Sequence, residues 1–418
     1  MIKTFRVAKY KNFVDTELNF GKINVFIGPN NSGKSNFIEA MQLGAELYGS
    51  GQDSHALQTA LKRRGWHKIL NNTFQHDDSA ILKYTVSLND LRLEVELDIN
   101  ISSPDSISHG FYIAKEIIRP TELHSAKQSG IDFISCHGEE QGKAIISLHT
   151  PDRQSGGSHT KKYSFKITTN DVITNQLKLL YLNSSFRTKL YIHFKDVVDR
   201  CHYHFGNQLH YSFSDIIPRV VSAAAKCEMG RDMLNAKCTD ILDVLLYLER
   251  EHNFLETYQD ILDMAIHDLE SIKIHPLGQE IYSLQATINK QKFSFSDLSD
   301  GSIRMFVLAL LLHTPERYTV LSLDEPELNL HPAWLKLLGK WMMRGTSFDQ
   351  LFISTHSPDL LDVFTEAFRE GEASIYVFDL KEGPRQLAPS EVADFLDQGW
   401  ELGDLYRVGE PQVGGWPW

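Results

Sequence analysis

One glycine-rich segment, Gly28–Ser35 with the sequence GPNNSGKS, constrains the fold of this chain more than any other feature. It follows an apolar, strand-like run at residues 23–27 and precedes residues 35–47, which have the apolar spacing of a helix. Glycines let backbone N–H groups turn inward, and the start of the following helix adds partial positive charge, so such a loop binds phosphate groups. The pattern therefore predicts an α/β fold with a phosphate-binding loop between a buried strand and a helix.

The residue types in this loop indicate that the phosphates belong to ATP bound together with Mg²⁺. Lys34 is expected to reach the β- and γ-phosphates and to take part in catalysis, and the hydroxyl of Ser35 is expected to hold Mg²⁺. Other groups along the loop would surround the rest of the triphosphate. The residues predicted to bind the nucleotide are Gly28, Asn30, Asn31, Ser32, Gly33, Lys34, Ser35 and Asn36.

A second apolar run, residues 318–327 with the sequence YTVLSLDEPE, contains two adjacent acidic residues at its end. In an α/β sheet, the carboxyl ends of the strands form the edge that binds ligands. Because neighbouring side chains on a strand point to opposite sides, the two acids can take different roles. We expect Asp324 to bind Mg²⁺ and Glu325 to act as the general base toward the attacking water.

A serine and a glycine precede a third predicted element, a helix over residues 303–312 that follows FSDLSDGS at residues 295–302. A helix start of this kind is a second anion site, in which Ser299 and Gly301 would bind phosphate. The alternative is an ordinary helix start, with Ser299 as its N-cap and Gly301 incidental. The sequence leaves both interpretations open.

A fourth motif is LFISTHSP at residues 351–358, a short apolar strand followed by His356. A lone histidine is more often structural than catalytic. At the end of a strand parallel to the one that carries Asp324, however, an imidazole can contact the γ-phosphate and the attacking water. We therefore count His356 among the candidate catalytic residues.

These four motifs, in this order, resemble those of ATP-binding-cassette ATPases. The nearest branch contains the SMC, RecF and OLD proteins, which are often described as AAA-family ATPases. Each motif has a counterpart in that branch: the Walker A motif at residues 28–35, the signature motif at residues 298–302, the Walker B pair Asp324 and Glu325, the D-loop at residues 327–332, and the switch histidine His356.

Further segments narrow the resemblance to stand-alone OLD-like ATPases. The sequence YKNF at residues 10–13 is similar to the strand and turn near the adenine in that branch, and LGDLY at residues 402–406 is similar to the ends of short members. OLD nucleases continue into a TOPRIM domain, for which the stretch after His356 is too short. Gln75 is the best candidate for the Q-loop glutamine.

The resemblance also implies how the chain is organised. Residues 1–100, with Walker A, and residues 281–418, with the signature, Walker B and switch histidine, would form one ATPase head. Residues 101–280 would form an inserted, mostly helical lobe. Two copies would complete each other's sites head to tail, closing on ATP binding and opening on hydrolysis. This predicts a homodimer or a higher even-numbered homo-oligomer.

Local patterns predict the elements outside the motifs. Apolar and polar residues alternate at residues 81–88 and 91–99, which indicates an antiparallel sheet with one face exposed to solvent. Residues 100 to about 175 are polar and turn-rich, so loops are expected there, for example at residues 102–105 and 154–158. Residues 176–271 carry apolar residues at helical intervals. This helical part either binds a partner or only buries its own core.

The composition limits the partners. A formal net charge of −12 argues against a protein that binds nucleic acid over its whole surface, although DNA binding at a local basic patch such as Lys62–Arg64 stays possible. No apolar run reaches the roughly 18 residues that indicate a membrane helix. Four scattered cysteines form no disulfide framework, and we expect a cytoplasmic protein that binds no membrane.

By resemblance, the cellular role would be bacterial anti-phage defence, with this ATPase as sensor or motor and a separately encoded nuclease or toxin as effector. Two alternatives stay open. A RecF-like DNA-repair clamp would need a basic face, which the net charge of −12 disfavours. A slowly hydrolysing scaffold would instead hold ATP stably and grip a toxin partner with the inserted lobe until release.

Overall fold

The computed structural model of the chain describes residues 1–49, 56–63, 79–88, 91–101, 111–123, 133–140, 143–151, 158–166, 199–228, 230–379, 382–410 and 413. The chain divides into two compact units. The first unit comprises Met1–Phe20, Gly33–Gln208 and Lys381–Pro384, and the second comprises Gly21–Ser32, Leu209–Leu380 and Arg385–Trp418. The chain therefore passes from the second unit to the first inside the glycine-rich segment.

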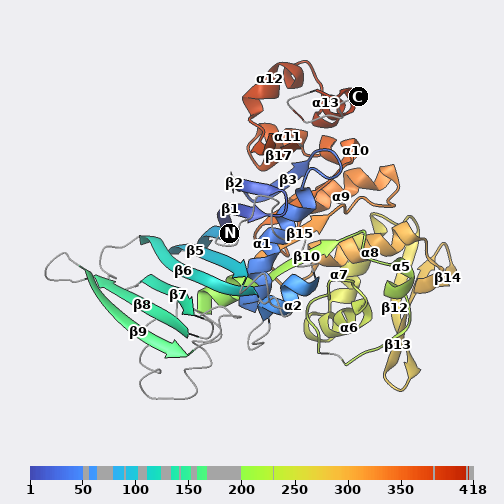
Figure 1. The fold of residues 1–418 in the computed structure, drawn as a ribbon. Coiled ribbons are helices and arrows are strands. Elements are labelled where there is room, and N and C mark those ends of the chain that lie inside the picture. Colours follow the sequence, from blue (N-terminus) through green and yellow to red (C-terminus); the bar gives the residue numbers. More distant parts are fainter. Residues whose placement is uncertain are drawn as a thin grey trace. The chain divides into compact units, whose positions relative to one another are not determined.

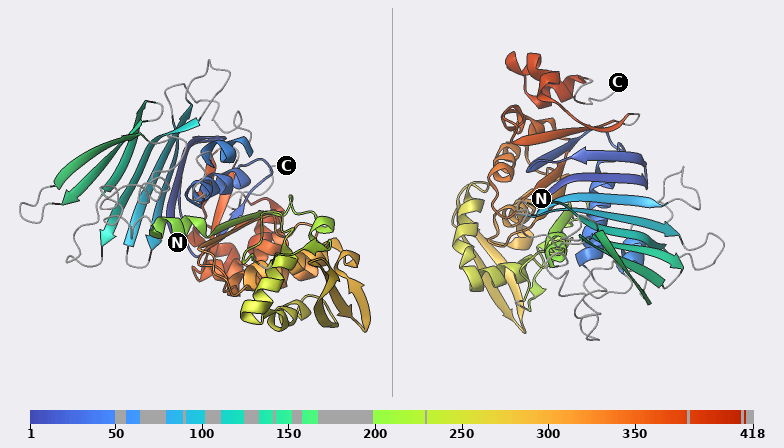
Figure 2. Two further views of the ribbon diagram at one scale, coloured as in Figure 1. Left: turned by 90° about the horizontal axis from the view of Figure 1, so that it is seen from below. Right: turned by 90° about the vertical axis from the view of Figure 1, so that its left-hand side faces the viewer.

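In the described residues of the first unit, an antiparallel sheet has eight strands in the order β2-β1-β4-β5-β6-β7-β8-β9. Figure 2 shows them side by side, from β2 in dark blue to β9 in green. The strands are β1 (Ile2–Tyr10), β2 (Phe13–Asn19), β4 (Ala80–Leu88), β5 (Leu91–Ile101), β6 (Phe111–Leu123), β7 (Phe133–Glu140), β8 (Lys143–Pro151) and β9 (Ser158–Lys166).

Helices α1 (Lys34–Gly49) and α2 (Ala56–Arg63) contact this sheet. Along β5, Leu93, Val95 and Leu97 are buried while the residues between them are half-buried, which confirms the predicted alternation. Phe37 of α1 packs edge-on against Phe5 of β1, with 5.3 Å between the ring centroids. The apolar face of the sheet is therefore the face that packs on the helices.

Strands β6 to β9 correct the expectation of loops between residues 100 and 175. Main-chain hydrogen bonds pair strands whatever their side chains are, and β9, with the sequence SHTKKYSFK, is mostly polar. Such a strand lacks the apolar alternation from which strands are predicted. Residues 102–105 and 154–157, which we expected in loops, lie outside the described residues, as do Gln75 and Arg64 of the basic patch.

The second unit is built on a six-stranded sheet in the order β10-β15-β16-β3-β17-β18, of which Figure 1 labels β10, β15, β3 and β17. Its strands β15, β16, β3 and β17 are parallel neighbours. Every residue of β3, β15 and β16 is buried, as expected for parallel strands covered on both faces. The strands are β3 (Ile23–Ile27), β10 (Gln208–Ser212), β15 (Val320–Asp324), β16 (Leu351–Ser354), β17 (Ala373–Asp379) and β18 (Gly383–Gln386).

Helix α8 of the second unit is buried along most of its length. The carbonyl of its Phe306 accepts the hydroxyl of Tyr258 from α7 at 2.6 Å. Its Arg304 donates to the carbonyls of Phe213 and Ile216 at 2.6 and 3.2 Å, which ties α8 to the loop after β10. The helices of this unit are α5 (Pro218–Val221), α6 (Ile241–His252), α7 (Phe254–Asp263), α8 (Asp300–His313), α9 (Pro332–Arg344), α10 (Pro358–Asp362), α11 (Thr365–Arg369), α12 (Pro389–Asp397) and α13 (Leu402–Val408).

A smaller antiparallel sheet of the second unit has the order β11-β13-β12, with β14 paired to β13. Its strands are β11 (Ala225–Lys226), β12 (Leu269–Gly278), β13 (Ile281–Ile288) and β14 (Gln291–Ser294). The helical expectation for residues 176–271 is therefore correct for α6 and α7 but wrong for β10, β11 and the start of β12.

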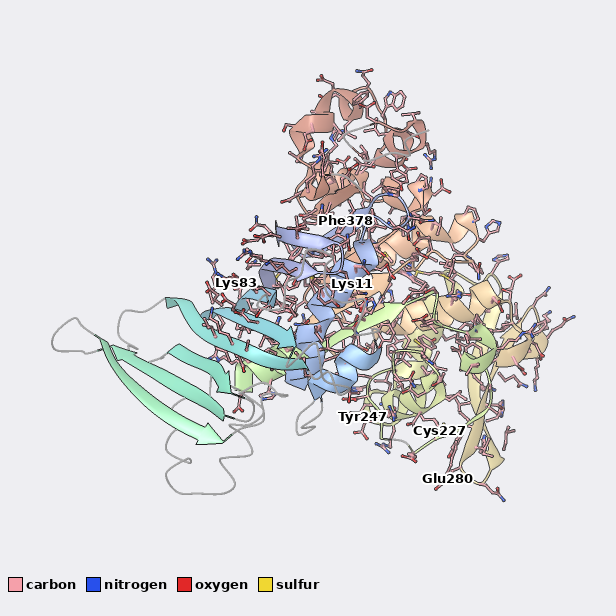
Figure 3. The ribbon with its side chains drawn as sticks, viewed as in Figure 1. Lys11, Lys83, Cys227, Tyr247, Glu280 and Phe378 are labelled. Carbon is pink, nitrogen blue, oxygen red and sulfur yellow. The ribbon has the colours of Figure 1, made fainter. Side chains whose placement is uncertain are left out.

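The expected boundary after residue 280 falls in the turn between β12 and β13, where Figure 3 labels Glu280. Residues 209–280, which were expected in the inserted lobe, share one hydrophobic core with residues 281–418, because α6, α7 and α8 bury their apolar faces together. The compact units therefore follow this continuous core rather than the three expected segments. The expected α/β class is confirmed.

Gly44 of α1 generates a prediction about the first unit. A Cβ at this position would lie 2.4 Å from Tyr84 Oη, and Tyr84 is buried with its hydroxyl bonded to the Met41 carbonyl at 3.0 Å. Alanine normally stabilises a helix by about 1 kcal/mol over glycine, but overpacking costs about 1–3 kcal/mol. We expect Gly44→Ala to lower the melting temperature, measured by circular dichroism. Gln42→Ala, at a half-buried position on the same helix, is the control. A more stable Gly44→Ala variant would contradict this packing.

Candidate nucleotide-binding and catalytic site

Three neighbouring strands of the second unit bring predicted site residues to one edge of the sheet. In the parallel register, Asp324 at the end of β15 lies beside Ser354 at the end of β16, and Ser354 lies beside Phe26 of β3. Gly28 and His356 each follow two residues later in the sequence. Because the carboxyl ends of parallel strands meet at one edge, the Walker B pair, the switch histidine and the start of the phosphate loop gather there.

The carboxylate of Asp324 is held by the neighbouring strand. The hydroxyl of Ser354 donates to Asp324 Oδ1, and both side chains are buried. The Asp324 carbonyl accepts the N–H of Phe213 at 2.9 Å, and the Ser354 carbonyl accepts the N–H of Glu325 at 3.0 Å. A carboxylate oriented by a second hydrogen-bonding group is typical of a metal ligand. Ser354 is not among the residues predicted from the sequence; its place at the end of the strand beside Walker B is the signal that could have found it.

Glu325 and His356 form a pair at this edge. Glu325 has a φ of 52°, in the left-handed region, so the chain turns sharply where β15 ends. Its Oε1 lies 3.4 Å from Nε2 of His356, and the two side chains are 35% and 26% exposed. A carboxylate and an imidazole in contact, and open to solvent, can together bind and polarise a water molecule. The structure thus brings together the predicted base and the predicted switch histidine.

A third acid, Glu327, contacts the segment that carries the histidine of this pair. Its Oε1 accepts the hydroxyl of Thr355 at 2.6 Å and the N–H of His356 at 2.9 Å. The side chain is half-buried, and its removal from water raises the pKa of the Glu327 carboxyl. Its Oε2 has no hydrogen-bond partner among the described residues. The sequence placed Glu327 only in the D-loop; its role in fixing the switch histidine became evident from the fold.

The first half of the phosphate loop, Gly28–Ser32, lies in the second unit. Gly28 has a φ of 141°, and a Cβ there would lie 2.3 Å from the carbonyl oxygen of Phe378, which is labelled in Figure 3. Asn31 also has a positive φ of 64°. Ser32 is buried, and its hydroxyl has no hydrogen-bond partner among the described residues. A loop in which the first position excludes any residue but glycine, with an unpaired hydroxyl in it, fits a phosphate group.

The second half of the loop lies in the first unit, at the start of α1. Gly33 has a φ of 104°, and its carbonyl accepts the N–H of Phe37 at 2.9 Å. The side chain of Asn36 accepts from Lys11 Nζ at 3.2 Å and donates to Asn12 Oδ1 at 2.9 Å. The turn between β1 and β2, which resembles the adenine-side turn of the family, therefore holds the beginning of α1.

Lys34 is buried at the first position of α1, with Ser35 next to it. Both follow directly on Ser32 and Gly33, where the chain passes from one unit to the other. The second unit carries Asp324 and Glu325. Joint action of Lys34 and Ser35 with the Walker B pair therefore stays a prediction from the sequence motifs.

The signature motif begins α8. Ser299 is its N-cap, and the serine hydroxyl accepts the N–H of Ser302 at 3.1 Å. Gly301 is buried, and a Cβ there would lie 2.9 Å from the carbonyl oxygen of Asn329 and 3.1 Å from the ring of Trp334. The interpretation of Ser299 as a helix cap is therefore correct, but Gly301 is not incidental. It lets the D-loop segment approach the start of α8.

Within the described residues, no three His, Cys, Asp or Glu side chains come close enough to hold a metal ion. The predicted Mg²⁺ site requires only Ser35 and Asp324 from the protein, since phosphate oxygens and water supply the other ligands. In the same part of the chain, no helix is both long and apolar enough to cross a membrane.

Comparison with protein families identifies the chain. Residues 23–362 match the family described as "AAA domain, putative AbiEii toxin, Type IV TA system". The chain belongs to this AAA-domain family. The match begins at β3 and ends at α10, so it includes the phosphate loop, the signature motif, the Walker B pair and the switch histidine. The resemblance to AAA-family ATPases, read from the motifs, is thereby confirmed at the level of the family.

Solved structures similar to this chain include three SMC heads. One, bound to the C-winged helix domain of ScpA, is 10% identical, with 94% of this chain and 99% of that chain covered and a TM-score of 0.47. A second, with an extended coiled coil and bound to the C-terminal domain of ScpA, derives from Pyrococcus furiosus (12% identity, 95% and 98% covered, TM-score 0.41). The third is from Thermotoga maritima (12% identity, 90% and 94% covered, TM-score 0.36). Comparison with curated proteins gave no match.

The bond between Ser354 and Asp324 generates a prediction. If Asp324 binds Mg²⁺, removing the supporting hydroxyl weakens Mg²⁺ binding about 10- to 100-fold, as for other groups that orient metal ligands. We expect Ser354→Ala to need correspondingly more Mg²⁺ for half-maximal binding of a fluorescent ATP analogue. Ser322→Ala removes another buried hydroxyl, two residues before Asp324 on β15, and is the control. Equal Mg²⁺ dependence in the two variants would exclude this role for Ser354.

Proposed function

We propose that this chain is a Mg²⁺-dependent ATPase that converts ATP and water into ADP and phosphate. The observation that carries the proposal is the contact between Glu325 and His356, 3.4 Å apart at the carboxyl edge of a parallel sheet. The phosphate loop leaves β3 at the same edge, two strands away from Asp324. Membership of the AAA-domain family supports nucleotide binding by this edge.

The chain's own residues suggest how hydrolysis proceeds. The Gly28–Ser35 loop binds the triphosphate, with Lys34 at the β- and γ-phosphates and the unpaired hydroxyl of Ser32 inside the loop. Glu325 accepts a proton from water as the water oxygen attacks the γ-phosphorus and the bond to the bridging oxygen of ADP breaks. Because Oε1 of Glu325 contacts His356 Nε2, the imidazole orients the same water.

Magnesium is the cation that we propose for the remaining groups. Ser35 and Asp324 are the candidate ligands, and the ion would neutralise charge on the β- and γ-phosphate oxygens. Ser354 supports the proposal because its hydroxyl already fixes Asp324 Oδ1. Glu327 has the matching role for the histidine, since it binds the His356 N–H and the Thr355 hydroxyl.

We infer that two chains complete each other's sites, as homodimers or higher even-numbered oligomers. The signature residue Ser299 is exposed at the start of α8, and the start of a helix is a place where a phosphate group of a second nucleotide can bind. A two-fold axis would then generate two equivalent sites from one kind of contact. ATP binding would close the assembly and hydrolysis would open it.

We further propose a cytoplasmic role in bacterial anti-phage defence, with a separately encoded nuclease or toxin as effector. The family name, which includes a putative AbiEii toxin and a type IV toxin–antitoxin system, supports this direction. OLD-like character, suggested by the motifs around Glu325 and His356, fits the same role. A RecF-like clamp on DNA is the alternative, and the net charge of −12 weighs against it.

Glu325→Gln tests the catalytic assignment. The amide fills the same space but accepts no proton, so we expect ATP to bind while turnover falls about 10²–10⁴-fold. The control is Glu316→Gln, because Glu316 forms a similar contact with a histidine, 3.1 Å from His252 Nε2, in the same unit. Phosphate release and ATP-analogue binding are measured on both. Turnover at the parental rate in Glu325→Gln would show that another group, such as His356, is the base.

Mixing two inactive variants tests the shared site. Lys34→Ala damages the chain's own phosphate loop, whereas Ser299→Arg damages the signature offered to a partner. A mixed dimer would carry one site with both lesions and one with neither, so activity should partly return. Mixing Lys34→Ala with Glu325→Gln is the control. Each of these changes damages the site that contains the same chain's phosphate loop and Walker B pair, so both sites of a mixed dimer carry one lesion and neither is intact. If the first mixture regains no activity while both variants still dimerise, Ser299 acts only as a helix cap.

A further inference from the structure

The carboxyl-terminal helix α13 lies outside the matched residues 23–362 and carries none of the four motifs. It nevertheless contacts a segment that begins the phosphate loop. Tyr406 of α13 is 4% exposed, and its hydroxyl donates to the carbonyl of Gly28 at 3.3 Å. Burial raises the pKa of the Tyr406 hydroxyl, so this group stays a donor at physiological pH.

The same helix is fastened to α10, which begins two residues after the switch histidine. The N–H of Gly403 donates to Asp362 Oδ1 at 2.7 Å, and a Cβ on Gly403 would lie 2.1 Å from the carbonyl oxygen of Pro358. The N–H of Leu402 donates to the Thr365 hydroxyl at 3.0 Å. In Figure 1, α13 lies at the end of the unit that also holds α10 and α11.

Arg407 adds a charged connection between the two helices. Its guanidinium binds Asp359 and, at 2.9 Å, Asp362 of α10, and it also binds Asp404 of its own helix at 2.9 Å. Charge-assisted hydrogen bonds to three carboxylates restrict α13 more than apolar packing alone would. A single short helix thus contacts both the beginning of the phosphate loop and the helix that follows His356.

The contact with Gly28 has a specific physical effect on the loop. The peptide that joins Gly28 to Pro29 has no N–H, because proline lacks one, so its carbonyl is its only polar group. A carbonyl oxygen turned toward bound phosphates would repel them. A donor on α13 favours the orientation in which this oxygen faces the helix instead, and glycine is needed because its φ is 141°.

We propose that α13 is a positioning element of the nucleotide site: Tyr406 holds the phosphate loop ready for ATP, and Arg407 holds α10 and hence His356 in place. The inference deepens the proposed ATPase function and rests on it. The competing explanation is that Tyr406 only fills the core, in which case its hydroxyl matters no more than that of any other buried tyrosine.

Tyr406→Phe separates these explanations because it removes the hydroxyl and keeps the ring. We expect ATP-analogue affinity to fall about two- to tenfold, the effect of one lost hydrogen bond, with little change in melting temperature. Tyr376→Phe is the matched control: its buried hydroxyl donates to Asn24 Oδ1 at 3.2 Å, on the same strand β3 but away from the loop. Unchanged affinity in Tyr406→Phe, or equal losses in both variants, would overturn the role of Tyr406.

Arg407→Ala tests the second contact. We expect kcat to fall by up to about a hundredfold, as for other misplaced catalytic groups, while the affinity for the ATP analogue stays near that of the parent. Arg369→Ala, which breaks the ion pair of Arg369 with Asp397 at 3.1 Å, is the control for loss of a surface arginine. Equal kcat values in the two variants would overturn the role of Arg407.

Measuring the parent chain beside these variants separates a failure of the proposed ATPase function from a failure of the proposed role of α13. A parent that binds no ATP analogue would overturn the proposed ATPase function, and the role of α13 with it. A parent that binds and hydrolyses ATP, beside variants of Tyr406 and Arg407 that behave like their controls, would overturn only the role of α13.

Discussion

The parallel pairing of β16 with β15 on one side and β3 on the other is the constraint on which the candidate site depends. It sets Ser354 beside both Asp324 and Phe26, so three loops leave the sheet at one level. A shift of one residue would turn every side chain of β16 to the opposite face, and the Ser354 hydroxyl could no longer reach Asp324. The hydrogen bond between these two side chains supports the carboxylate, and it forms only when the two strands pair in the correct register.

Elements were predictable from the sequence where a motif and its flanking pattern lie together in the chain. The apolar run before Asp324 predicted β15, and the apolar run before Gly28 predicted β3, because buried parallel strands are apolar throughout. Ser299 was correctly seen as a possible N-cap, since caps are recognised from neighbouring residues. The polar strand β9 was missed for the opposite reason, because its position depends on a paired neighbour rather than on its own side chains.

The supporting residues of the site were missed because their contacts join distant parts of the chain. Ser354 meets Asp324 across two strands, and Glu327 meets His356 from the segment after Walker B. Tyr406 meets Gly28 over 378 residues of sequence. No local pattern encodes such pairs. Gly301 shows a related effect. The sequence left open whether this glycine is incidental, but the segment that packs on it requires it, because a Cβ there would lie 2.9 Å from the Asn329 carbonyl oxygen.

The position of β3 in its sheet has a consequence for how the protein is made. Both neighbours of this strand come from far along the chain; Asn24, for example, bonds to the Leu351 carbonyl 327 residues away. During synthesis β3 therefore emerges early, with apolar side chains and with neither edge paired, and its partner strands follow only when nearly the whole chain has been made. Strands that pair over such long sequence separations fold slowly, and the unpaired strand exposes aggregation-prone apolar surface until they do. The hairpin of β1 and β2, in contrast, can close at once. A ribosome-bound chain would thus contain the glycine-rich sequence long before it contains a sheet to support it, and truncated products would be candidates for aggregation rather than partial activity.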